Sequence, residues 1–141
     1  MAEALLRAAL PQTSPWRVFS AGLAAFEGSS ASDFAVAALN ELGCDLRAHR
    51  SRQVTPERVR KATVIVPMTR AHTDQLTTQF PDARDRIYLL RSFDPDASAN
   101  ADVTDPFCGS LDDYRRCRDV IRRAIPGLVR FLEQNDSSTV K

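Results

Sequence analysis

The stretch that decides the fold is Ala-Thr-Val-Ile-Val-Pro-Met-Thr-Arg, residues 62–70. Its apolar run, Thr63 to Val66, lacks polar alternation, which is typical of a strand covered on both faces. Thr69 follows as a candidate N-cap, so we expect a helix from there to about Phe80. A buried strand that leads directly into a helix favours an α/β fold.

The alternation of strand and helix continues on both sides of this stretch. We expect further strands at residues 16–21 and 86–90, and a loop over residues 92–104. Helices are expected at residues 1–10, from Ser32 to about residue 42 with Gly43 as its C-terminal stop, from Thr55, and after Ser110. This order predicts a parallel sheet with helices on both faces. We expect one domain over residues 1–134 and a disordered tail over residues 135–141.

Composition excludes several classes of protein. The 141 residues carry 19 basic and 18 acidic side chains, which gives no electrostatic reason to expect a nucleic-acid or membrane-surface partner. Three cysteines and two histidines argue against a disulfide framework or a zinc site, so we expect no metal and no cofactor. No apolar run approaches the ~20 residues that span a bilayer. Reduced thiols then indicate a cytoplasmic protein.

Five short segments, taken together and in order, resemble the low-molecular-weight protein tyrosine phosphatase family. They are residues 1–5, 20–22, 49–53, 68–72 and 105–107. The resemblance extends from Met1 to about Glu133. It implies a four-stranded parallel sheet and a reaction in which a cysteine thiolate attacks phosphorus, with an aspartate as general acid.

The family's nucleophile loop, Cys-x5-Arg-Ser-Pro, is followed by Met-Ala-Glu, and Met1-Ala2-Glu3 matches that continuation. The resemblance therefore implies that the central first strand and the loop are missing, through a misplaced start site or a truncated gene. The first helix also begins without a capping residue. Losing a central strand would leave two strands with unpaired backbone groups, so we expect the chain to be unstable and inactive.

One segment matches the spacing of the lost loop. Cys44 is followed by Arg50 and Ser51 at the required distance. We interpret this match as chance, because the segment lacks glycine, leads into no helix and would place the carboxylate of Asp45 inside a phosphate cradle.

The resemblance assigns roles to five residues. Asp105 matches the general acid, although an aspartate before proline is also common in ordinary turns. Phe107 and Phe26 match aromatic walls of the substrate cleft, although both could be simple apolar anchors of loops. Ser20 and His49 match residues that support the phosphate loop, with a strand-end serine and a solvated histidine as the alternatives.

Three functions remain open at this point. The first is a protein tyrosine phosphatase by lineage, and Phe107 makes a protein arginine phosphatase of the same family a serious alternative. The second is a non-catalytic module that binds phosphorylated proteins. The third, an arsenate reductase of the same fold, is disfavoured because Cys108 and Cys117 do not resemble a resolving pair.

Overall fold

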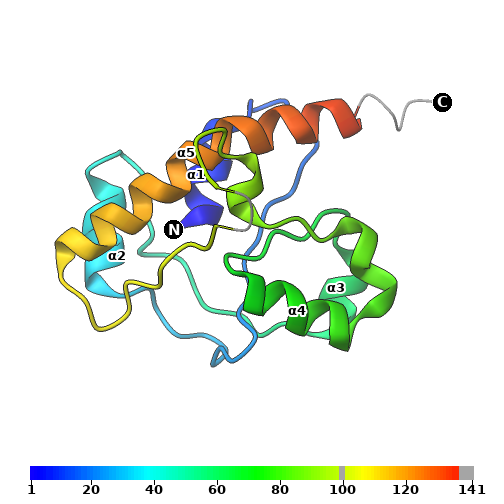
Figure 1. Ribbon diagram of the computed structural model, residues 1–141. Helices are drawn as coiled ribbons and strands as arrows, with labels where there is room; N and C mark the ends of the chain where they lie inside the picture. Colours follow the sequence, from blue (N-terminus) through cyan, green and yellow to red (C-terminus); the bar gives the residue numbers. More distant parts are fainter. Residues whose placement is uncertain (99–100, 137–141) are drawn as a thin grey trace.

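The computed structural model describes residues 1–98 and 101–136 (Figure 1). In chain order the elements are α1 (Ala2–Ala9), α2 (Asp33–Asn40), α3 (Pro56–Lys61), α4 (Arg70–Gln79), the 3-10 helices η1 (Pro81–Arg86) and η2 (Leu90–Phe93), and α5 (Leu111–Asp136). All five predicted helices are confirmed. α5 includes the first two residues of the predicted tail. Residues 99–100 of the predicted loop and 137–141 of the tail lie outside the described residues.

Local side-chain chemistry sets the starts of three helices. Ser32, Thr55 and Thr69 each accept a hydrogen bond from the backbone N–H three residues further on, at 3.4, 3.2 and 3.2 Å. Each bond satisfies one of the N–H groups that a helix leaves unpaired at its first turn. α2 is stopped by Gly43, whose φ of +73° suits a residue without a side chain.

The three predicted strands do not form a continuous sheet among the described residues. Within residues 1–98 and 101–136 there are only isolated bridges, between Gly22 and Gln53, Ser30 and Arg50, and Ile65 and Ile87. Residues 65–67 and 86–90 are joined by three backbone hydrogen bonds of 2.8–2.9 Å, from Ile65 to Arg86, Tyr88 to Ile65 and Leu90 to Pro67. The pairing is short because η1 ends at Arg86 and η2 begins at Leu90, which leaves three extended residues between them.

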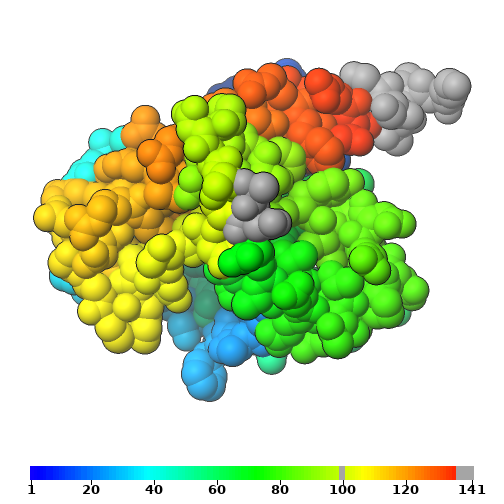
Figure 2. Space-filling model, in the orientation of Figure 1, coloured from blue at the N-terminus to red at the C-terminus, as the bar shows by residue number. Residues whose placement is uncertain are grey.

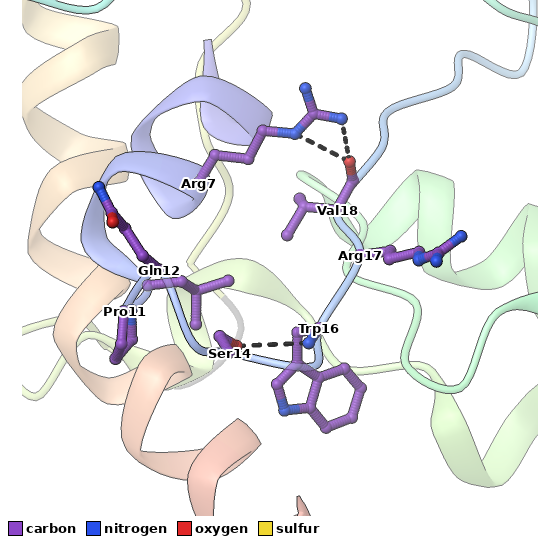
Figure 3. A pocket seen from close by; sticks show the side chains of 8 residues that line it. Arg7, Pro11, Gln12, Ser14, Trp16, Arg17 and Val18 are labelled. Atoms are coloured by element: carbon purple, nitrogen blue, oxygen red, sulfur yellow. Dashed lines mark hydrogen bonds between the residues drawn. The ribbon is translucent and has the colours of Figure 1, made fainter.

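Residues 16–21 are extended, and their burial alternates as in a strand. Residues 17–21 nevertheless make no backbone–backbone hydrogen bond with any other described residue. The carbonyl of Val18 instead accepts from the Arg7 guanidinium, at 3.0 Å from Nε (Figure 3). The local conformation was therefore predicted correctly, but the ladder was not, because a strand also needs a neighbour at hydrogen-bonding distance.

The main core lies between α1, α2 and α5, with α5 running along one side of the molecule and α3 and α4 at the opposite side (Figure 1). Its buried members include Leu5, Leu39, Leu46, Leu90, Val103, Tyr114, Ile121, Ala124, Leu128 and Leu132. Val64, Val66 and Met68 pack against its edge. Val59, Leu76 and Ala83 are buried outside this cluster, among α3, α4 and η1.

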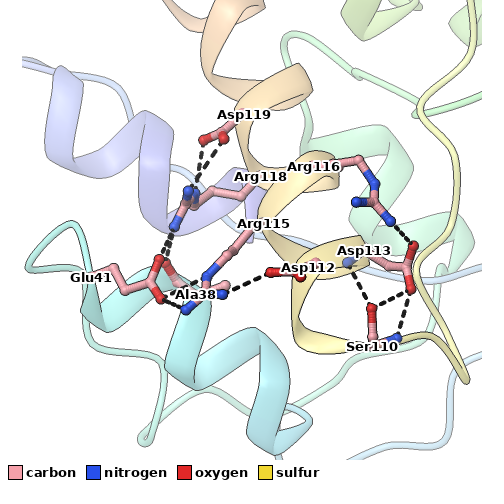
Figure 4. Close-up of polar contacts among 9 residues, drawn as sticks. All are labelled: Ala38, Glu41, Ser110, Asp112, Asp113, Arg115, Arg116, Arg118 and Asp119. Atoms are coloured by element: carbon pink, nitrogen blue, oxygen red, sulfur yellow. Dashed lines mark hydrogen bonds and ion pairs between the residues drawn. The ribbon is translucent and has the colours of Figure 1, made fainter.

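A polar clamp joins α2 to α5 beside this core (Figure 4). Arg118 is only 8% exposed and donates to the Ala38 carbonyl at 2.8 Å and to Glu41 at 2.6 Å. Arg115 binds the other oxygen of Glu41 at 2.8 Å through Nε. These two hydrogen bonds, Arg115 first and Arg118 second, lower the pKa of Glu41 from its ordinary 4.5 to about 2. The clamp fixes the end of α2 that leads into the following loop.

Within residues 1–98 and 101–136, no helix combines the length and the apolar character needed to cross a bilayer.

Candidate active site

Two of the predicted site residues, Ser20 and His49, approach the same side chain in the first turn of α1. Ser20 donates through its hydroxyl to Glu3 Oε2 at 2.6 Å, and His49 Nδ1 lies 3.6 Å from the same oxygen. Arg7, one turn along the helix, binds Glu3 Oε1 at 2.9 Å. The Glu3 side chain is only 9% exposed. A buried carboxylate with several partners is held firmly, because an unpaired charge there would be costly.

Sequence reasoning identified Ser20 and His49 but did not single out Glu3 as their common partner. The structure brings the two residues together on this carboxylate, from a segment before α2 and a segment after it. The signal was present, since Glu3 is acidic in the first turn of a helix and has an arginine four residues later. Support of a phosphate loop by Ser20 and His49 stays a prediction.

Asp105 lies in the exposed loop that leads into α5. Its Oδ1 accepts from the backbone N–H of Phe107 at 3.0 Å, which is the Asx-turn geometry that the alternative reading expects. Cys108 follows with a φ of +63°, an uncommon conformation for a residue with a side chain. The loop therefore has a defined shape, although its Asp105 carboxylate stays open to solvent.

The end of this loop is fixed by a reciprocal cap at the start of α5 (Figure 4). Ser110 donates through both its backbone N–H and its hydroxyl to Asp113 Oδ2, each at 2.7 Å. The Asp113 backbone N–H donates back to the Ser110 hydroxyl at 3.3 Å. The bonds from Ser110, with a further one from Arg116, lower the pKa of Asp113 to about 2. Asp105 is thus carried on a loop anchored to the longest helix.

A buried thiol connects Asp105 to the start of α1. Burial raises the pKa of Cys117, the nearby Met1 amino group opposes that shift, and the charge of Asp105 adds to it. Burial in turn lowers the pKa of the Met1 amino group. The Cys117 thiol is thus within electrostatic range of both the Asp105 carboxylate and the Met1 amino group.

The two predicted aromatic walls are exposed and separate. Phe107 is 77% exposed and Phe26 is 85% exposed. Neither ring contacts another aromatic ring among the described residues. Neither residue is an anchor in the core, so the alternative of simple apolar loop anchors loses its support. Their role as cleft walls stays a prediction.

The segment from Cys44 to Ser51 is not folded as a phosphate cradle. Asp45 occupies it with a two-point ion pair to Arg47, at 2.9 and 2.8 Å. The Arg50 guanidinium donates to two backbone carbonyls, of Arg47 and His49. No helix follows until α3, which begins at Pro56. These contacts support the interpretation that the matching Cys-x5-Arg-Ser spacing is a coincidence.

Two further observations concern a surface hollow and the absence of a metal-binding group from residues 1–98 and 101–136. A hollow of about 390 Å³ lies where the end of α1 meets residues 12–18, with Arg7, Trp16 and Arg17 among its walls (Figure 3). It faces the opposite end of α1 from Glu3. Among the described residues there is no group of three His, Cys, Asp or Glu side chains that could hold a metal ion.

Comparisons with known proteins identify the family of this chain. A family model described as low molecular weight phosphotyrosine protein phosphatase matches residues 1–138. The chain is similar to a protein-arginine-phosphatase of Geobacillus stearothermophilus, with 38% identity over 82% of this chain and 76% of that protein. It is also similar to a protein-arginine-phosphatase of Bacillus subtilis (strain 168), with 32% identity over 96% of this chain and 89% of that protein.

Solved structures give the same result. The YwlE arginine phosphatase from Geobacillus stearothermophilus superposes with a TM-score of 0.86 and 34% identity, covering 99% of this chain and 88% of that chain. The tyrosine phosphatase amsI of Erwinia amylovora superposes with a TM-score of 0.81 and 29% identity, covering 92% of this chain and 81% of that one. By family model, sequence and fold, this chain belongs to the low molecular weight phosphotyrosine protein phosphatase family of hydrolases.

Proposed function

We propose that this chain carries the general acid and the substrate-binding side of a protein phosphatase that works through a cysteinyl-phosphate intermediate. The observation that carries the proposal is the meeting of Ser20 and His49 on the Glu3 carboxylate, in the first turn of α1. A helix N-terminus favours a phosphate through its free N–H groups and its dipole. Asp105, on its anchored and exposed loop, would protonate the leaving atom and then accept a proton from the attacking water.

The phosphorylated residue is proposed to be arginine, with tyrosine as the second candidate. Sequence analysis placed tyrosine first. One finding changes this order: the relatives with 38% and 32% identity are arginine phosphatases. Tyrosine stays a candidate because a relative from Erwinia amylovora described as a probable tyrosine phosphatase is 30% identical over 94% of this chain. Either group is planar and would fit against the ring of Phe107.

A second part of the proposal concerns the 141 residues by themselves, which we expect to bind but not to hydrolyse phosphorylated proteins. Cys44 lies in a loop occupied by an ion pair, and Cys117 is buried with a raised pKa. Cys108 is exposed but stands beyond Asp105 on the same loop. None of the three is a thiolate at the mouth of a helix, which the reaction requires. The three free thiols also support placing the protein in the cytoplasm.

The test compares the 141 residues alone with a chimera. In the chimera, the strand and cysteine loop of the Geobacillus stearothermophilus relative precede Met1. We expect no hydrolysis of p-nitrophenyl phosphate by the 141 residues, and turnover by the chimera. Asp105→Asn should lower the chimera's kcat by ~10²-fold or more, because general acid catalysis typically contributes that much. Asp96→Asn, a change in another exposed part of the same connection, is the matched control.

Three outcomes would contradict parts of the proposal. An Asp105→Asn chimera as active as the Asp96→Asn control would show that Asp105 is not the general acid. Turnover by the 141 residues that is lost on Cys44→Ser would show that Cys44 is a nucleophile after all. Phosphotyrosine peptides hydrolysed faster than phosphoarginine peptides would restore tyrosine as the substrate.

A further inference from the structure

Basic side chains are concentrated in one segment of an otherwise balanced chain. Residues 45–61 contain six lysine or arginine side chains but only two acidic ones, whereas the whole chain has 19 and 18. This segment includes His49 at the candidate active site and runs on into α3. The excess positive charge therefore lies next to the proposed site of phosphate chemistry and not on a remote face.

Three arginines of the segment, Arg50, Arg52 and Arg60, form no ion pair among the described residues, and the first two lie beside His49 in the chain. Arg47 is paired with Asp45, and Arg58 is paired with Glu27. Arg50, by contrast, donates only to backbone carbonyls, and Arg52 has no side-chain partner among the described residues. A guanidinium bound only to carbonyls keeps its positive charge and can still attract a carboxylate.

The same segment holds Phe26 in a fixed position. The Ser51 hydroxyl donates to the Phe26 carbonyl, and the Ser51 carbonyl accepts from Gly28 N–H at 2.9 Å. Ser51 also exchanges hydrogen bonds with Ser29, at 2.8 and 2.9 Å. The loop carrying Phe26, drawn in light blue, protrudes at the lower edge of the molecule (Figure 2). An 85% exposed ring on a backbone fixed in this way binds a partner at a small cost in entropy.

Glu27, the residue after Phe26, forms hydrogen bonds with the basic segment. Its Oε1 accepts from Gln53 N–H at 2.9 Å and from Arg58 at 2.7 Å. These bonds, in that order, lower the pKa of Glu27, and the charge of Arg52 contributes to the same shift. The Arg52 carbonyl accepts from Gly22 N–H at 2.8 Å, which places Arg52 at the base of the Phe26 loop. Backbone contacts thus bring Arg50 and Arg52, which form no ion pair among the described residues, next to the loop that carries the exposed Phe26 ring.

We propose that Phe26, Arg50 and Arg52 form a docking surface for an acidic segment of the protein substrate, beside its phosphorylated residue. The apolar part of that segment packs on Phe26, and its carboxylates pair with Arg50 and Arg52. This inference rests on the proposed function, because it assumes that the substrate is a protein.

Binding of a labelled peptide, followed by fluorescence anisotropy, tests the surface on the full chain. The peptide is rich in Asp and Glu around one tyrosine and is used without phosphate, so that binding does not depend on the active site. Arg50→Glu, Arg52→Glu and Phe26→Ser should each weaken binding by about tenfold. Arg84→Glu, which changes an exposed arginine that likewise has no side-chain partner among the described residues, should change it by less than about twofold.

A peptide of opposite charge distinguishes the loss of a charge contact from misfolding of the variant. A lysine-rich version should bind the Arg50→Glu, Arg52→Glu double variant more tightly than it binds the parent chain. Equal losses for Arg52→Glu and Arg84→Glu would overturn the proposal, because attraction would then be non-specific. A single-stranded oligonucleotide that binds as tightly as the peptide, with the same sensitivity to Arg52→Glu, would also overturn it. A chimera that fails to hydrolyse phosphate while the acidic peptide still binds would refute only the proposed function.

Discussion

The side of the molecule built from α1, α2 and α5 differs from the side built from the extended segments and α3 and α4. The first side has a continuous buried core and the clamp of Arg118 and Glu41. On the second side, residues 17–21 lack backbone partners among the described residues. Helices satisfy their own backbone groups, whereas extended segments depend on a neighbour. The two sides therefore differ in what they need from the rest of the chain.

The largest difference is expected in amide hydrogen exchange, which measures this contrast directly. The amides of residues 17–21, together with those of Val64 and Val66, have no backbone acceptor among the described residues. They should exchange on the order of 10³-fold faster than the central amides of α5, which open only with large-scale unfolding. The amides of Ile65, Tyr88 and Leu90, which are hydrogen-bonded, should lie between the two. Protection of residues 17–21 equal to that of α5 would show that the two sides do not differ.

A glycine where α5 packs on η2 provides the next test. Gly127 of α5 lies against η2, and a methyl group added there would overlap the Phe93 carbonyl oxygen. Alanine normally stabilises a helix interior by about 0.5–1 kcal/mol relative to glycine. We expect Gly127→Ala instead to lower the free energy of unfolding by about 1–3 kcal/mol, because the closely packed backbones must separate. Urea unfolding followed by circular dichroism measures this.

The sign of the effect decides this test. Arg130→Ala, a change at an exposed position of the same helix, is the control and should alter the free energy of unfolding by less than about 0.5 kcal/mol. A Gly127→Ala variant more stable than the parent chain would mean that α5 and η2 are not in close contact.

The smallest effect concerns acid stability. The folded pKa of Glu41 is about 2 and lies below its ordinary 4.5. Its stabilising contribution is therefore complete above about pH 4.5 and is lost as the pH falls toward 2. Glu41→Gln should make the loss of thermal stability between these pH values shallower, because Glu41 pairs with distant Arg115 and that pair breaks on unfolding.

Asp45 supplies a matched comparison for this measurement. Hydrogen bonds from Arg47 lower its pKa to about 2 as well. Arg47 is only two residues away, so part of this contact survives in the unfolded chain and contributes less to the pH dependence. Asp45→Asn should consequently change the acid profile less than Glu41→Gln. Equal changes would contradict the view that the clamp between α2 and α5 is the pH-sensitive contact.

Sequence reasoning succeeded where a signal is local. Thr55 and Thr69 were predicted as caps because each precedes a helical pattern, and both accept the expected hydrogen bond. The predicted strand at residues 86–90 was wrong, because the 3-10 turns on either side leave three extended residues. The contact of Ser20 and His49 with Glu3 was not predicted, because nothing near Glu3 in the sequence reveals that the two residues approach it.

The sequence by itself determined the helices, their caps and the family, since these depend on residues close together in the chain or on motifs in order. Only the tertiary structure decided which polar groups meet, such as Glu3 with Ser20 and Arg118 with Glu41. It also decided that the extended segments form no sheet among the described residues. The physical reason is that helical hydrogen bonds close within a few residues, whereas strand pairing and buried ion pairs join groups that only folding brings together.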